Sequence, residues 1–246
     1  TAGYLDAVVD FGADNTGASV TTSQLQSAIN AATSQHKPLF IPAGTYLVDG
    51  TLTVEDDAGG ERDEQNTFIT GSCVDPQNRT GIVLQAGTFP DSRRRGHVIR
   101  HKGFADENYP DTFNRILEHV DIRIEEDNAG AVALRWRGAE GCFLNDIDID
   151  VTDGYAGIDM VLGSGGSTVG LSITGGEYGI RLSSDSAQPT PTFTDLVLRH
   201  QTTNAIYSNQ TRGALAITGG HFNMYDEVPV FYLARHSGFT WSPGGN

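Results

Sequence analysis

The stretch "DIDVTDGYAGIDM" (residues 148–160) contains two short segments in which apolar and polar residues alternate, with a turn-forming "TDG" between them. Such alternation is typical of β-strands that have one buried and one exposed face. Ile149 and Ile158 would point into a core, and Asp150 and Asp159 would point away from it. The stretch therefore predicts two strands joined by a short turn.

Both segments recur along the chain. The first series aligns on Ile122, Ile149, Ile173, Leu198 and Ile217, and the second on Leu134, Ile158, Ile180, Ile206 and Phe231. Two strands per repeat of about 24 residues favour a parallel β-helix, in which each coil stacks on the previous one at about 4.8 Å. A propeller blade needs a longer period, and a Greek-key sandwich would not keep two series in phase. We predict an all-β fold, a single-stranded right-handed parallel β-helix.

One segment has helical periodicity. Its apolar positions are spaced i, i+3, i+4 and i+7: Leu25, Ala28, Ile29 and Ala32. Thr21 and Gln24 fit a capping box. We therefore predict an N-terminal capping α-helix over about residues 22–33.

The coils are predicted over about residues 38–235, within a single β-helix domain of residues 1–246. The final stretch "HSGFTWSPGGN" (236–246) offers no amphipathic helix to cover the last coil. Because an open parallel edge favours aggregation, we expect another domain, chain or subunit to cover it, as part of a longer protein or assembly.

Composition narrows the function. A net charge of -15 argues against a nucleic-acid partner, whose phosphates would be repelled. No apolar run reaches the roughly 18 residues of a membrane span, and we expect no membrane partner. Cys73 and Cys142 are predicted to be several coils apart, as two buried thiols.

The N-terminal segments "VVDFGADNTG" (8–17) and "PLFIPAGTYLV" (38–48) flank the predicted helix. This arrangement resembles the pectate-lyase-like parallel β-helix superfamily, although "ADNTGASVTTS" (13–23) departs from that family's usual Asp- and Gly-rich pattern. The resemblance implies a carbohydrate-active protein, secreted or extracellular. Phage tailspikes share the same signature.

The middle of the chain is also similar in part to glycoside hydrolase family 55, the exo-acting β-1,3-glucanases. The segments that carry this likeness are "AVALRW" (131–136), "GSGGSTVGLSITGGEYGI" (163–180) and "TNAIYSN" (203–209). Members of that family are longer, with two β-helices, and their catalytic acid lies in the second.

The polar positions of the second series form a predicted outer stripe of Arg135, Asp159, Arg181, Tyr207 and Tyr232. Asp159 would lie between two arginines. In the first series, Asp150 would stack over Arg123, with Arg199 two coils further on. We interpret Asp159 and Asp150 as acid/base candidates, and Arg135, Arg181, Arg199, Tyr207 and Tyr232 as substrate-binding residues. The alternative is a solvated ladder of salt bridges on an outer wall.

Acids that are two residues apart on one strand lie about 6.5–7 Å apart, within the range for inverting glycoside hydrolysis. A calcium site of Asp121, Asp148 and Asp150 is an alternative, which the neighbouring Arg123 disfavours. No other cofactor is expected.

Three functions remain open from the sequence. The leading one is a glycoside hydrolase acting on a polysaccharide, with β-1,3-glucan as one substrate. The second is a polysaccharide lyase or epimerase acting on a uronate polymer. The third is a glycan-binding or tailspike-like module without catalysis.

Overall fold

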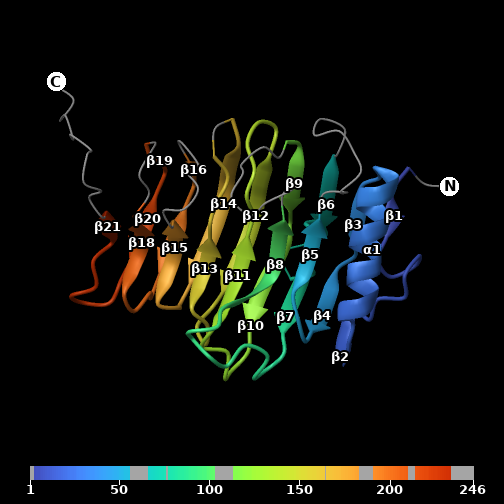
Figure 1. Cartoon of the computed structure of the whole chain (residues 1–246), viewed down its shortest axis with the longest axis horizontal. Coiled ribbons are helices and arrows are strands. Elements are labelled where there is room, and N and C mark those ends of the chain that lie inside the picture. The colour runs from blue at the N-terminus through green and yellow to red at the C-terminus, as the bar shows by residue number, and fades with distance from the viewer. Residues whose placement is uncertain are drawn as a thin grey trace.

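The computed structural model describes residues 3–55, 66–75, 77–102, 113–163, 165–182, 191–209 and 214–233. In these ranges the chain winds into stacked coils whose strands form two sheets, one of 14 strands (sheet A) and one of seven (sheet B). Figure 1 shows the coils following one another along the long axis, with α1 at the N-terminal end. This is the predicted parallel β-helix with its single helix.

Sheet A consists of two rows of strands. The first row contains β1 (Leu5–Asp6), β3 (Leu39–Ile41), β6 (Thr67–Gly71), β9 (Arg115–Glu118), β16 (Thr192–Thr194) and β19 (Ala216–Thr218). The second row contains β2 (Thr16–Val20), β4 (Gly44–Val48), β7 (Thr80–Leu84), β10 (Val120–Ile124), β17 (Val197–Arg199) and β20 (His221–Asn223). The two long strands β12 (Phe143–Asp150) and β14 (Ser167–Thr174) pair with strands of both rows.

Sheet B forms the remaining face of each coil. Its strands are β5 (Leu52–Glu55), β8 (Gly96–Lys102), β11 (Ala131–Arg135), β13 (Ala156–Asp159), β15 (Tyr178–Leu182), β18 (Asn204–Ser208) and β21 (Phe231–Leu233). Neighbouring strands pair in parallel. The second series of the repeat lies here in constant register, from Leu134 through Ile158, Ile180 and Ile206 to Phe231.

A bend divides the two rows of sheet A. At this bend one residue per coil has a positive φ, namely His119, Asp146, Gly170, Asp195 and Gly219. The left-handed conformation costs least for Gly, Asn and Asp, which explains most of these residue types. Because the bend interrupts strand alternation, Leu144 and Ile147 are both buried although they are three residues apart.

The bend gives each central coil three strand segments, not the two that the repeat predicts. As a result, Ile217 lies beside Phe193 in the first row, and Phe222 takes the place predicted for Ile217 beside Leu198. The prediction for the last member of the first series was therefore wrong. The core is otherwise as expected, with Ile122, Ile149 and Ile173 all buried.

Helix α1 (Thr22–Gln35) covers the N-terminal coil and buries Leu25, Ala28, Ile29 and Ala32, as predicted. The capping-box prediction was wrong: Thr21 makes no side-chain cap, and its hydroxyl accepts a hydrogen bond from the Asp14 backbone N–H at 3.0 Å instead. Within the described ranges no helix is long and apolar enough to cross a membrane.

Two further predictions concern the periphery. Cys142 is buried, but Cys73 is exposed in the loop after β6, so the prediction of two buried thiols was half wrong. The stretch 236–246, from which we expected a covering partner at the last coil, lies outside the described residues, as do positions 234 and 235 of the predicted coils.

Candidate functional site

Six residues follow one another across the outer face of sheet B, one per coil. This sheet B stripe comprises Arg100, Arg135, Asp159, Arg181, Tyr207 and Tyr232. Strand register places Arg100 beside Arg135, Arg181 between Asp159 and Tyr207, and Tyr232 beside Tyr207. The structure therefore brings together Asp159 and four of the five predicted substrate-binding residues.

Asp159 is the single acid of the stripe, and only 9 % of its side chain is exposed. Its Oδ1 lies 3.8 Å from Arg181 Nη1, and its Oδ2 lies 4.0 Å from Arg135 Nη1 and 3.9 Å from His97 Nε2. These are ion-pair distances and too long for hydrogen bonds. Within the described residues, neither Asp159 Oδ1 nor His97 Nε2 has a hydrogen-bond partner.

The charges around Asp159 determine its protonation. Burial by itself would raise the pKa of Asp159, but His97, Arg135 and Arg181 outweigh burial and hold the pKa below its ordinary value of 3.8. The carboxylate is therefore ionised at neutral pH. It can accept a proton or a hydrogen bond, but it cannot serve as a general acid.

Sequence reasoning missed two residues of this cluster, His97 and Arg100, which both come from β8. Burial lowers the pKa of His97 below 6.5, and Asp159 offsets this only in part, so the imidazole is neutral at pH 7. The strand was missed because 35 residues (134 − 99) separate Ile99 from its neighbour Leu134. That spacing lies outside the range of the other repeats.

Tyrosines extend the cluster toward the C-terminal coils. The rings of Tyr207 and Tyr232 stack with centroids 5.0 Å apart and an interplanar angle of 2°. The Arg181 guanidinium lies 5.5 Å from the Tyr207 centroid, and Tyr178 contacts Tyr207 edge-on at 5.6 Å. An arginine cluster beside stacked rings can bind both the carboxylate and the apolar face of an acidic sugar.

Asp150 and Arg199 lie elsewhere, on the outer face of sheet A. Because Asp150 ends β12 and Asp159 ends β13, the two acids lie on different sheets. This agrees with their predicted positions in the first and second series, and the acid/base roles of both residues stay predictions. Asp150 is in register with Arg123, as predicted, but its Oδ1 accepts a hydrogen bond from the Thr152 hydroxyl at 2.7 Å.

Asp150 and Arg199 help to line a groove of about 380 Å³, the sheet A groove. Its polar lining is Asp121, Arg123, Asp148, Asp150, Ser172, Thr174 and Arg199. The groove crosses the second row of sheet A.

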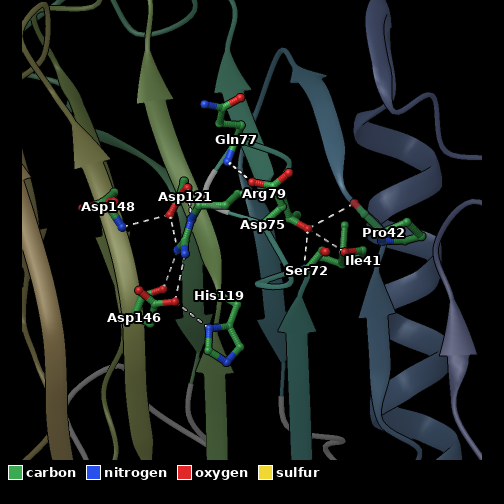
Figure 2. A network of polar contacts seen from close by, with 11 residues as sticks. Ile41, Pro42, Ser72, Asp75, Gln77, Arg79, His119, Asp121, Asp146 and Asp148 are labelled. Carbon is green, nitrogen blue, oxygen red and sulfur yellow. Dashed lines mark hydrogen bonds and ion pairs between the residues drawn. The ribbon is translucent and has the colours of Figure 1, made fainter.

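Asp146 leaves this outer face because of its φ of 50° at the bend. Its Oδ2 instead accepts hydrogen bonds from Arg79 Nη1 at 2.9 Å and pairs with His119 Nδ1 at 2.8 Å. Arg79 also binds Asp121 with two nitrogens, at 2.6 and 2.9 Å. Figure 2 shows Arg79 between the two carboxylates. We call Arg79, His119, Asp121 and Asp146 the bend network.

The bend network bears on the calcium alternative. Both carboxylate oxygens of Asp121 accept hydrogen bonds from Arg79, so a cation would compete with a guanidinium for them. In the described part of the chain, no group of three or more His, Cys, Asp or Glu side chains is arranged to hold a metal ion.

This chain spans only part of the curated relative and of the first solved structure that it matches. The non-secreted LysM effector LysM19 of Penicillium expansum is 28 % identical over 194 residues, which are 71 % of this chain and 14 % of the effector. Among solved structures, ORF18 of Geobacillus virus E2 shares the fold at 16 % identity and a TM-score of 0.50, over 90 % of this chain and 41 % of that one. The A-module of the mannuronan C-5 epimerase AlgE6 of Azotobacter vinelandii is 13 % identical to this chain, with a TM-score of 0.31, over 95 % of this chain and the whole module.

A family model supplies the assignment. It describes rhamnogalacturonase A and epimerase proteins that are pectate lyase-like, and it matches residues 7–226, which include every residue of the bend network and every residue of the sheet B stripe except Tyr232. The partial likeness to glycoside hydrolase family 55 stays a prediction. This chain belongs to the rhamnogalacturonase A/epimerase, pectate lyase-like family.

Proposed function

We propose that this carbohydrate-active protein binds a uronate-containing polysaccharide along the sheet B stripe and abstracts a proton beside a uronate carboxylate, as a lyase or an epimerase does. One observation carries the proposal: Arg135 and Arg181 flank a single carboxylate, Asp159, in consecutive coils of a chain whose net charge is -15. A local excess of positive charge on an acidic protein favours an anionic ligand at that face.

Each group has a role in this proposal. Arg135 and Arg181 bind the uronate carboxylate, whose neutralisation makes the adjacent C–H more acidic. Tyr207 and Tyr232 stack on neighbouring sugar rings. Asp159, ionised by its cationic neighbours, accepts the proton or holds the two guanidinium groups in place.

Glycoside hydrolysis is the second candidate, because the matching family is described by a rhamnogalacturonase as well as an epimerase. Two-carboxylate hydrolysis needs an acid and a base on the same face. Asp159 is the single carboxylate of the sheet B stripe, and Asp150 faces the sheet A groove. A hydrolase with Asp159 as its base would therefore need another acid. A neutral substrate such as β-1,3-glucan would also offer Arg135 and Arg181 no carboxylate to bind.

One experiment separates these functions. The full chain is incubated with polygalacturonate, alginate, rhamnogalacturonan and β-1,3-glucan, and reducing ends, unsaturated uronates and C5 configuration are recorded together. We expect unsaturated or epimerised product from a uronate polymer. Reducing ends without unsaturation would support hydrolysis instead, and binding without any product would support a non-catalytic module.

A further inference from the structure

We propose that the sheet A groove is a second glycan-binding site, selective for a neutral oligosaccharide and independent of the sheet B stripe. The groove spans β7, β10, β12, β14 and β17 on a different face from Asp159. Its volume of about 380 Å³ lies at the lower end of the range for ligand sites, roughly 300–1,000 Å³. This inference goes beyond the proposed reaction and does not rest on it.

The charge of the groove favours a neutral ligand. Three aspartates and two arginines line it, and at its edges Arg79 binds Asp121 and Glu125 accepts from Arg123, so the arginines do not outnumber the acids. An anionic sugar would meet Asp148 and Asp150, which are both exposed. In the sheet B stripe, by contrast, two arginines flank one acid, Asp159. The two faces therefore select ligands of different charge.

The side chains in the groove keep hydrogen-bonding capacity for a ligand. Arg123 is in register with Asp150, yet it donates to Glu125 on its own strand at 3.3 Å. Asp150 accepts from Thr152 through Oδ1, which leaves Oδ2 for the groove. Arg199 donates to Ser172 through Nη1 at 3.3 Å, and its other N–H groups remain available.

This donor and acceptor set suits a sugar diol. A carboxylate accepts two hydroxyl protons, and a guanidinium donates to hydroxyl oxygens, so alternating acids and arginines match hydroxyls that both donate and accept. No aromatic side chain lines the groove, and without ring stacking we expect weak binding.

Gly81 offers a way to block the groove without disturbing the fold. It lines the groove on β7. A Cβ placed there would meet only the Gly44 carbonyl oxygen, at an ordinary 3.8 Å, and φ at Gly81 is not positive. Gly81→Leu should therefore fill the groove while the coil remains intact.

The test is an NMR titration of the full chain with β-1,3-linked glucotetraose and, separately, with tetragalacturonate, each up to about 10 mM, enough to detect a Kd near 1 mM. We expect changes in chemical shift on β10, β12 and β14 with the neutral sugar.

Two variants should weaken this binding. Asp150→Asn should weaken it about tenfold, because a hydrogen bond to a charged group is lost, and Gly81→Leu should abolish it. The matched controls are Asp153→Asn, which changes an exposed acid on the following turn, and Tyr232→Ala on sheet B. Both variants should bind the neutral tetrasaccharide at the sheet A groove as the parent does.

Other outcomes would overturn the proposal: no shifts with the neutral sugar, shifts confined to sheet B, tighter binding of the uronate at the groove, or unchanged binding by Gly81→Leu. Because the readout is binding at sheet A, loss of the reaction proposed for sheet B would leave the result unaffected. Conversely, turnover of a uronate polymer without binding of the neutral sugar at the sheet A groove would overturn this inference and leave the proposed function intact.

Discussion

The bend network on sheet A and the Asp159 cluster on sheet B use the same three residue types, Arg, Asp and His, in opposite ways. In the bend network Arg79 forms hydrogen bonds of 2.6–3.0 Å, and the Asp146 side chain is 45 % exposed. Around Asp159 the corresponding distances are 3.8–4.0 Å, and the side chain is 9 % exposed. A network in which each group is hydrogen-bonded stabilises the coil stack. A buried carboxylate oxygen without a partner, such as Asp159 Oδ1 within the described residues, is costly unless it serves binding or catalysis.

The largest expected effect follows from Asp159→Asn. If the cluster is the site, turnover of the uronate polymer should fall by roughly 100-fold or more, because a positioned charge near the reacting atoms is lost. The measurement is the initial rate of product formation, with circular dichroism to confirm folding. Asp146→Asn is the matched control in the bend network and should retain activity. Full activity in Asp159→Asn would remove Asp159 from the mechanism.

Substitutions in the bend network should lower the stability of the fold and not the activity. Arg79→Met removes the guanidinium that bridges two partly buried carboxylates, and we expect a loss of about 2–3 kcal/mol in the free energy of unfolding. Urea unfolding measures it. Arg93→Met removes an arginine whose side chain is 89 % exposed and should change stability by less than about 0.5 kcal/mol. Equal effects of the two variants would contradict the structural role of the network.

Lowering the pH should reduce the stability of the fold in two steps, the first from His97 and the second from Asp146. His97 has a lowered pKa when folded, so below about pH 6.5 the unfolded chain binds a proton that the folded chain does not, and stability falls as the pH falls. The pKa of Asp146 is also lowered: burial raises it, but Arg79 and His119 outweigh burial. Its contribution is present above the unfolded pKa of 3.8 and is lost as the pH falls through its folded pKa.

Urea midpoints between neutral and acidic pH measure both steps. His97→Gln should reduce the first loss, and Asp146→Asn the second. A flat profile between pH 7 and 5 in the parent would show that His97 does not resist protonation in the folded state.

The smallest effect concerns the tyrosines. Tyr232→Ala removes one ring of the stacked pair, and polymer binding should weaken up to about tenfold, because aromatic pairs contribute about 0.5–1.5 kcal/mol. Tyr225→Ala is the matched control: this ring is 55 % exposed and stacks on His200 instead. Binding isotherms with the uronate polymer give the Kd of each variant. Equal Kd values would show that the stacked tyrosines do not contribute to binding.

The repeat predicted sheet B better than sheet A. Leu134, Ile158 and Ile180 recur without large insertions, so alignment alone placed Asp159 between Arg135 and Arg181. Sheet A failed at Ile217 because the left-handed bend adds a third strand, which a two-strand repeat does not contain. Asp146 lies at this bend, with a φ of 50°.

Long-range partners could not be predicted from spacing. Arg79 lies in a loop before β7, 42 residues from Asp121 and 67 from Asp146. His97 reaches Asp159 from a coil that an irregular spacing separates from the next. Residues in loops and insertions do not follow the repeat. Their partners can therefore be identified only in the folded structure, where the coils are stacked.

By itself the sequence determined the β-helix, its capping helix and the order of residues along the sheet B stripe, because alternation and period follow directly from strand geometry. Only the tertiary structure decided that a bend divides sheet A into two rows, that His97 and Arg100 join the Asp159 cluster, and that Asp121 is held by Arg79. The direction in which each face points depends on the bends between strands, and a repeat length does not encode those bends.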